Sequence, residues 1–303
     1  MGYGTERIHA LLMTALVSFV YLTAPVSGEP ENNRRVFAPE AALVKLADGF
    51  RYTEGPAWGP DGKLYFTDRS SSRIITWSPE EGISDFRVDP DGANGLFFTS
   101  KGDLIVCESG ARRVVSIARD GKETVLADAY EGKKLNSPND ACCDAKGGIY
   151  FSDHSMRSKE PLEQAGDHIY YITPDRSNII RVTHDLKYPN GVIINPGGDR
   201  LYVTDSGANE TYVYTINPDG TLRDKHVFAH EGFDGLAMDE KGNVYITPSE
   251  NVVSVYDPSG TRIDEIATPS RPSNLCFGGE DKRTLFITAG NSVYYIKMGV
   301  RGL

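Results

Sequence analysis

The chain has 303 residues, of which 39% are hydrophobic and 24% charged, a composition typical of soluble globular proteins. Its formal net charge of −10 at pH 7 argues against nucleic acid as the main partner, because phosphate binding requires a basic surface. The length accommodates either one large all-β domain or two ordinary domains.

The N-terminus has the pattern of a secretory signal. Arg7 and His9 precede an apolar stretch at 10–24, and small residues lead from there to Gly28. We predict a signal peptide at 1–28 that is cleaved after Gly28, followed by a flexible N-terminal segment at 29–40. The apolar stretch is shorter than a membrane span, which needs about 20 residues, although an uncleaved anchor is the alternative. We therefore expect an exported protein, periplasmic or secreted, without membrane association after signal cleavage.

From residue 41 onward the sequence repeats one pattern six times, with a period of roughly 40 to 50 residues. Each copy begins with a carboxylate or amide residue, usually followed by Gly and an apolar run. The six head residues are Glu54, Asn94, Asn139, Asn190, Asp234 and Asn274. A repeat of this length predicts a propeller or a solenoid.

Further strands are expected within each copy, in segments rich in Leu, Ile, Val, Tyr, Phe and Thr. The second strands are expected at 62–68, 102–108, 148–153, 199–205, 242–247 and 282–288. The third strands are expected at 73–77, 113–117, 168–172, 212–216, 252–256 and 292–296. More polar fourth strands follow turns, for example at 124–127, 178–182 and 262–266. Four antiparallel strands per copy are typical of a propeller blade.

The sixth copy is incomplete, because only residues 299–303 follow its third strand and Met298. One strand-like segment, at 42–46, stands ahead of the first copy without an assignment. We therefore predict an all-β, six-bladed β-propeller over 41–303 in which this N-terminal strand completes the last blade. Such closure joins the first blade to the last and removes an open sheet edge.

The four cysteines are too few for a disulfide scaffold in a chain of this size, and their spacing matches no zinc pattern. They are Cys107, Cys142, Cys143 and Cys276. We expect them to be buried as small apolar residues, with a disulfide or redox role as the alternative.

The head residues of the copies should meet at one mouth of the central channel, because the first strand of each blade lines that channel. Taken singly, each is explained by a turn or a strand end, where Asn and Asp are common. Six polar residues in six copies favour a shared function. The set contains two carboxylates and four amides without His or Cys, which suits Ca²⁺ or Mg²⁺, and Ca²⁺ in particular. Zinc would be expected to recruit His or Cys.

Several longer motifs carry a resemblance to a known family. They are Glu54-Gly-Pro-Ala-Trp58, Leu135-Asn-Ser-Pro-Asn-Asp140, Asn190-Gly-Val192, Asp234-Gly-Leu-Ala-Met-Asp239 and Ser273-Asn-Leu-Cys-Phe-Gly-Gly279. With these motifs in order, the chain resembles the gluconolactonase / senescence marker protein (regucalcin) family over essentially its whole length after residue 40. The runs 107–114 and 130–140 are similar to the bacterial gluconolactonase branch.

The resemblance implies a lactone hydrolase with one divalent cation. Glu54, Asn190 and Asp234 would hold the ion, and Asn139 would contact the metal or the substrate. Asp234 would also act as general base. Ca²⁺ is favoured, with Mg²⁺, Mn²⁺ or Zn²⁺ as alternatives. Such an ion polarises the lactone carbonyl, and a neighbouring carboxylate takes the proton of the attacking water. The expected partner is a small-molecule lactone, and we expect a monomer.

Three departures from the family pattern concern the substrate side. Animal members carry Arg two residues before the asparagine, where this chain has Ser137, so a cation that grips the substrate is missing. The bacterial branch usually has His after the acidic residue of the second blade, where Ser109 follows Glu108 here. The segment Asp153-His-Ser-Met-Arg157 stands where that branch often reads Asp-Pro-Pro-Tyr-Gly.

Asn94, Glu108 and His154 are further candidates for contacts with the substrate, although a surface or loop-stabilising role is the alternative for His154. Two other functions stay open. A paraoxonase-like aryl-ester or organophosphate esterase would have a second, buried metal and a channel histidine. A non-catalytic propeller would bind a ligand and keep the metal only to stiffen its core.

Overall fold

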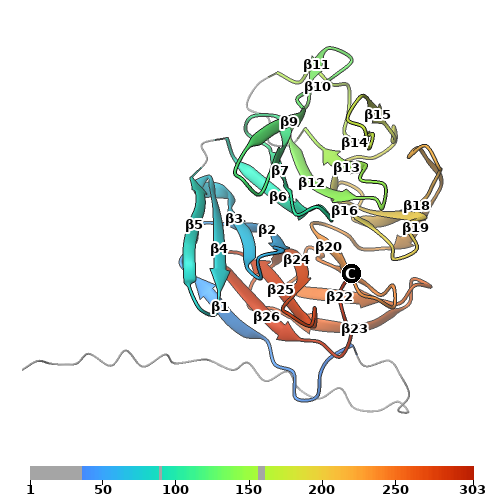
Figure 1. The fold of residues 1–303 in the computed structure, drawn as a ribbon. Helices are drawn as coiled ribbons and strands as arrows, with labels where there is room; N and C mark the ends of the chain where they lie inside the picture. Colours follow the sequence, from blue (N-terminus) through green and yellow to red (C-terminus); the bar gives the residue numbers. More distant parts are fainter. Residues whose placement is uncertain (1–35, 89–90, 156–160) are drawn as a thin grey trace, which may run out of the picture.

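The computed structural model describes residues 36–88, 91–155 and 161–303, so the predicted signal peptide at 1–28 lies outside the described residues. Within this part the only helical element is a 3₁₀ turn, Arg69–Ser71. Six four-stranded antiparallel sheets surround a central axis as the blades of a propeller, as Figure 1 shows. The predicted fold is confirmed. No helix in the described residues has the length and apolarity to cross a membrane.

The first three blades follow one another along the chain. Blade 1 contains β2 (Thr53–Trp58), β3 (Leu64–Asp68), β4 (Arg73–Ser78) and β5 (Gly82–Val88). Blade 2 contains β6 (Ala93–Phe98), β7 (Leu104–Glu108), β8 (Arg113–Ile117) and β9 (Glu123–Ala127). A small hairpin, β10 (Ala129–Tyr130) and β11 (Lys133–Lys134), connects it to the next blade. Blade 3 contains β12 (Pro138–Cys143), β13 (Ile149–Asp153), β14 (His168–Ile172) and β15 (Ile179–Arg181).

The other three blades complete the ring. Blade 4 contains β16 (Pro189–Ile194), β17 (Arg200–Asp205), β18 (Glu210–Ile216) and β19 (Leu222–Ala229). Blade 5 contains β20 (Leu236–Met238), β21 (Val244–Ile246), β22 (Val252–Tyr256) and β23 (Arg262–Ala267). Blade 6 contains β24 (Pro272–Gly278), β25 (Thr284–Ala289) and β26 (Ser292–Lys297), with β1 (Val44–Asp48) as its outer strand.

The N-terminal strand closes the last blade, as predicted, although it begins two residues later than the segment 42–46. β1 pairs antiparallel with β26, so that Val44 lies opposite Tyr295 and Asp48 opposite Ser292. Residues before β1 also contact this blade. Phe37 forms a β-bridge with Met298, and Val36 is buried. The described part of the segment 29–40 therefore packs against blade 6.

The hydrophobic core lies between neighbouring blades. The central strands of a blade are buried on both faces, and β13 and β14 are buried at every position. One cluster joins Ala57 and Ile74 of blade 1 to Leu96 and Val106 of blade 2. Strands buried on both faces read as continuous apolar runs, which explains the second and third segments of each copy. All four cysteines are free thiols.

A recurring carboxylate at the end of the second strand fixes the loop that leads into the first strand. Asp153 accepts hydrogen bonds from the backbone N–H groups of Asn136, at 2.8 Å, and Ser137, at 2.6 Å. Asp68 binds the loop before β2 in the same way, and Asp205 the loop before β16. These contacts set where each inner strand begins, and thereby position the residues at its head.

Candidate metal centre at the channel mouth

The inner strands β2, β6, β12, β16, β20 and β24 are neighbours around the central axis (Figure 1). Five of the six head residues lie near the start of an inner strand, and Asp234 lies two residues before β20. All six side chains are in the interior, with residue exposures between 2% and 8%. Closure of the ring thus places residues from all six copies at the same end of the channel.

Glycines next to the head residues permit this close arrangement. A Cβ atom on Gly55, whose φ is +47°, would lie 2.1 Å from the carbonyl oxygen of Asn94 in the next blade. A Cβ on Gly191 would lie 2.6 Å from the carbonyl oxygen of Asp234. Real Cβ atoms do not approach so closely, so the glycine in the repeated motif is required by contact between adjacent inner strands.

Hydroxyl groups of one blade hold the inner strand of the next. Thr67 donates to the carbonyl oxygen of Asn94 at 3.0 Å. Ser152 donates in the same way to Asn190, and Thr204 to Asp234. The backbone of the head residues is therefore fixed from the neighbouring blade, which pre-organises their side chains.

Two of the amide oxygens have no hydrogen-bond partner among the described residues. These are Oδ1 of Asn94 and Oδ1 of Asn190, both buried. The amide nitrogen of Asn190 donates to Ser206 Oγ at 3.4 Å, which orients the oxygen away from that hydroxyl. A buried polar atom without a partner costs roughly 1–3 kcal/mol, and a bound cation would supply the missing interaction.

Two buried carboxylates complete a donor set for such a cation. Glu54 is 4% exposed and its Oε2 accepts the N–H of Gly55 at 3.0 Å. Asp234 is held by the guanidinium of Arg271, 3.3 Å from its Oδ2. In the described ranges no group of three His, Cys, Asp or Glu side chains could hold a metal. A site here must therefore draw on amide oxygens beside Glu54 and Asp234, and this combination fits Ca²⁺.

Asn139 is oriented by a buried histidine. Its amide nitrogen lies 2.9 Å from Nε2 of His154, and the imidazole is 0% exposed. The ring of Tyr188 packs on the imidazole with centroids 4.1 Å apart. An amide N–H donates to Nε2 only when the imidazole carries its proton on Nδ1. His154 therefore positions the side chain of Asn139. A direct contact between His154 and a substrate stays a prediction, which the complete burial of the imidazole does not favour.

Glu108 points away from the channel. Arg113 of β8 donates to its Oε2, and Arg87 of β5 lies 3.5 Å from its Oε1. Arg87 belongs to the outermost strand of blade 1 and Arg113 to the third strand of blade 2, so Glu108 joins these blades. Its predicted contact with substrate hydroxyls has no support in this geometry, whereas Asn94 lies in the ring itself.

Two residues at the mouth were missed by the sequence analysis. Asp140 occupies, in blade 3, the position that glycine has in most copies. Its Oδ2 lies 3.4 Å from the amide of Asn274 in blade 6, and burial, with the charge of Glu54 adding to it, raises the pKa of Asp140 to about 7. The second residue at the mouth is Arg271. Asp140 could have been found from the sequence, because it replaces a glycine of the repeat, whereas no repeated pattern singles out Arg271.

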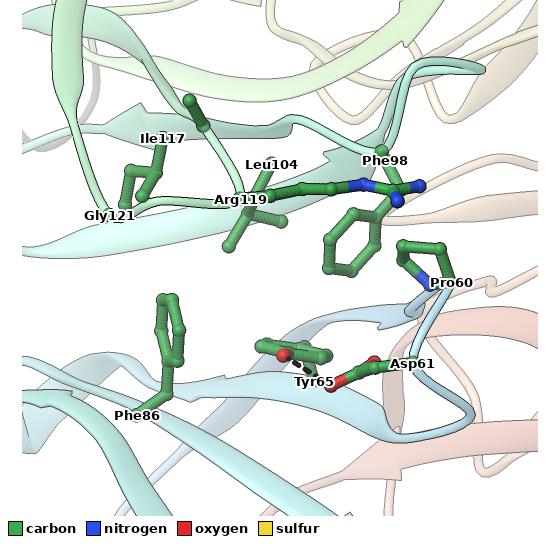
Figure 2. A pocket seen from close by; sticks show the side chains of 11 residues that line it. Pro60, Asp61, Tyr65, Phe86, Phe98, Leu104, Ile117, Arg119 and Gly121 are labelled. Carbon is green, nitrogen blue, oxygen red and sulfur yellow. Dashed lines mark hydrogen bonds between the residues drawn. The ribbon is translucent and has the colours of Figure 1, made fainter.

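The pocket in Figure 2 lies elsewhere, at the opposite end of the inner strands of blades 1 and 2. It measures about 340 Å³ and is lined by aromatic and aliphatic side chains that include Phe86, Phe98 and Leu104. Tyr65 donates a hydrogen bond to Asp61 at 2.9 Å within it. None of the predicted site residues lines this pocket. The convergent polar groups are at the mouth.

The family comparison agrees with the motifs. The sequence model of the SMP-30/Gluconolactonase/LRE-like region matches residues 52–291, so the chain belongs to this family. It is 27% identical over 288 residues to a gluconolactonase of Zymomonas mobilis, covering 83% of this chain and 80% of the relative. It is 26% identical over 250 residues to the pentonolactonase XacC of Haloferax volcanii, covering 78% and 81%.

A solved structure supports the same assignment. A gluconolactonase from Xanthomonas campestris has a TM-score of 0.80 and 29% identity, covering 88% of this chain and 91% of that chain. The predicted resemblance is confirmed.

Proposed function

We propose that this chain is a lactonase that opens a sugar lactone or a related lactone at the channel mouth, with one divalent cation as cofactor. Membership of the family makes it an enzyme of the lactonase class. The metal is supported by Oδ1 of Asn190, which has no hydrogen-bond partner in the described part of the chain and lies in the same ring as the buried carboxylates of Glu54 and Asp234. Ca²⁺ suits these oxygens best.

The chain would bind the ion through Glu54, Asn190 and Asp234, with Asn139 as a further oxygen. Bound there, the ion would supply a Lewis acid that polarises the lactone carbonyl and orients or acidifies a water. Asp234 takes the proton of the attacking water, whose oxygen bonds to the carbonyl carbon. The ring C–O bond then breaks, and the ring oxygen receives the proton held by Asp234 and leaves as a hydroxyl. The product is an open-chain hydroxy acid.

The substrate class follows from relatives that are a gluconolactonase and a pentonolactonase. Asn94 and Asn139 are the amides in the ring that would contact substrate hydroxyls. Export to the periplasm or the outside is part of the proposal and rests on the signal pattern of residues 1–28.

Hydrolysis of δ-gluconolactone, followed as acid release with and without a chelator, tests the proposal. Asp234→Asn is expected to lower kcat roughly 10²- to 10⁴-fold, because it removes the general base while keeping the shape of the side chain. Asp219→Asn is the matched control, since Asp219 lies in an exposed turn. Turnover that survives both chelation and Asp234→Ala would rule out the mechanism. Lack of turnover on every lactone would favour a ligand-binding propeller, and turnover of aryl esters alone a paraoxonase-like enzyme.

A further inference from the structure

Arg271 is the arginine that contacts the predicted general base. It lies directly before β24, and its Nη1 is 3.3 Å from Oδ2 of Asp234. Its Nη2 donates to the hydroxyl of Tyr52 at 2.9 Å, and its guanidinium carbon lies 4.7 Å from the ring centroid of Phe233. These contacts come from the loops before β2 and β20. The guanidinium of blade 6 is therefore fixed by both neighbouring blades.

The same guanidinium keeps donors available. A guanidinium has five N–H groups. Among the described residues, the hydrogen bonds to Asp234 and Tyr52 use two of them. The side chain is 30% exposed, so the others can reach a ligand at the mouth. A guanidinium stays protonated in proteins, so Arg271 keeps its positive charge at the mouth. Arg271 is a permanent, pre-oriented cation.

Charge balance indicates what this cation binds. The carboxylates of Glu54 and Asp234 together would balance one divalent ion. The third carboxyl group at the mouth, Asp140, bonds to the N–H of Ala141 and the amide of Asn274, whereas the positive charge of Arg271 stands beside Asp234 at the reaction centre. A neutral lactone does not neutralise that charge. Ring opening supplies a negative charge that can neutralise it. The carboxylic acid formed from the carbonyl carbon and the water oxygen releases its proton and becomes a carboxylate.

We propose that Arg271 is the residue that binds the carboxylate formed when the lactone ring opens. This inference rests on the proposed function and assigns the product subsite of the same mouth. It also bears on Ser137, where the animal members of the family carry an arginine that grips the substrate. The cation comes from blade 6 instead of blade 3. Because the negative charge develops during the reaction, Arg271 contacts the transition state more strongly than the lactone, and so acts mainly on kcat.

Titration calorimetry of the calcium-loaded protein with gluconate, the open-chain carboxylate, is the direct test. Arg271→Met is expected to weaken gluconate binding roughly 10- to 100-fold, the loss of one charge-assisted contact. Arg271→Lys should keep part of the affinity, since lysine keeps the charge without the planar fork. Glucitol has the same carbon chain without a carboxylate and should bind both proteins equally. Arg51→Met removes a positive charge from an exposed side chain in the loop before β2 and should leave gluconate binding unchanged.

Kinetics with δ-gluconolactone give a second readout, in which Arg271→Met should lower kcat with little change in KM and relieve inhibition by gluconate. Thermal unfolding and calcium titration of each variant separate these effects from misfolding and metal loss, and Arg271→Lys carries the test if Arg271→Met does not fold. Equal gluconate affinity in wild type and Arg271→Met, an equal loss in Arg51→Met, or lactone turnover without gluconate binding in wild type would overturn the assignment. If wild type hydrolyses no lactone, the proposed function fails, and the gluconate titration still decides whether Arg271 binds a carboxylate.

Discussion

The two ends of the inner strands use the same polar residue types in opposite ways. At the turn end, after inner strands such as β12, β16 and β20, Asp and Asn side chains bond to their own turns. Asn195 accepts the N–H groups of Asp199, at 3.1 Å, and Arg200, at 2.9 Å. At the mouth end of the same strand, Oδ1 of Asn190 is buried and has no hydrogen-bond partner among the described residues.

This difference separates structural polar residues from candidates for binding. The turn residues satisfy backbone donors a few positions away, as Asx turns do. At the mouth, Glu54 and Asn274 also accept the N–H of the next residue, but Oδ1 of Asn94 and Oδ1 of Asn190 accept no hydrogen bond among the described residues. A buried acceptor that the fold does not satisfy persists at a cost, which a bound ligand can offset.

Two glycines of blade 1 test the close packing of the mouth and should give the largest effect. Gly55 and Gly62 both have positive φ, +47° and +77°, but only a Cβ on Gly55 would meet another atom. Gly62→Ala should cost about 1 kcal/mol of unfolding free energy, from backbone strain alone. Gly55→Ala should cost about 3 kcal/mol or more, because the inner strands must separate. Urea denaturation measures the unfolding free energy of both variants. Equal losses of unfolding free energy in Gly55→Ala and Gly62→Ala would contradict tight packing at the mouth.

The two asparagines of β16 and its turn test the unpartnered oxygen. Calcium at a hundredfold excess over Kd should stabilise the wild type by about 2.7 kcal/mol, and chelation should remove this gain. Asn190→Ala is expected to lose most of the calcium-dependent stabilisation. Asn195→Ala should lower stability by about 1 kcal/mol with or without calcium, because it removes only turn hydrogen bonds. Thermal unfolding of each variant with calcium and with chelator measures the calcium-dependent stabilisation. If Asn190→Ala keeps the stabilisation of the wild type, Asn190 is not a ligand.

Two threonines of blade 4 should show the smallest contrast. Thr204 donates to the carbonyl oxygen of Asp234 and accepts the N–H of Gly191 at 2.8 Å, in the interior. Thr221 donates to Asp219 at 2.6 Å in an exposed turn. Thr204→Val should cost about 1–2 kcal/mol and Thr221→Val under about 0.5 kcal/mol. Chemical denaturation measures the unfolding free energy of both variants. A larger loss of unfolding free energy in Thr221→Val than in Thr204→Val would contradict the greater structural importance of the mouth end.

Much of the fold could be predicted because it is written in short-range patterns. The apolar second and third segments of each copy gave strands close to their observed bounds, and the missing fourth strand of blade 6 predicted closure by the N-terminal strand. The burial of His154 could not be predicted in the same way. It depends on Tyr188 of the next blade, and no feature near residue 154 shows that this ring packs against it.

The sequence by itself determined the number of blades, the closure of the ring and the oxygen-rich chemistry of its six head residues. These properties follow from periodicity and residue type, which local patterns express directly. Only the tertiary structure decided which of these oxygens stay without a partner, and that Arg271 stands beside Asp234. Both depend on contacts between side chains from different blades, which differ from copy to copy and therefore leave no repeat for the sequence to show.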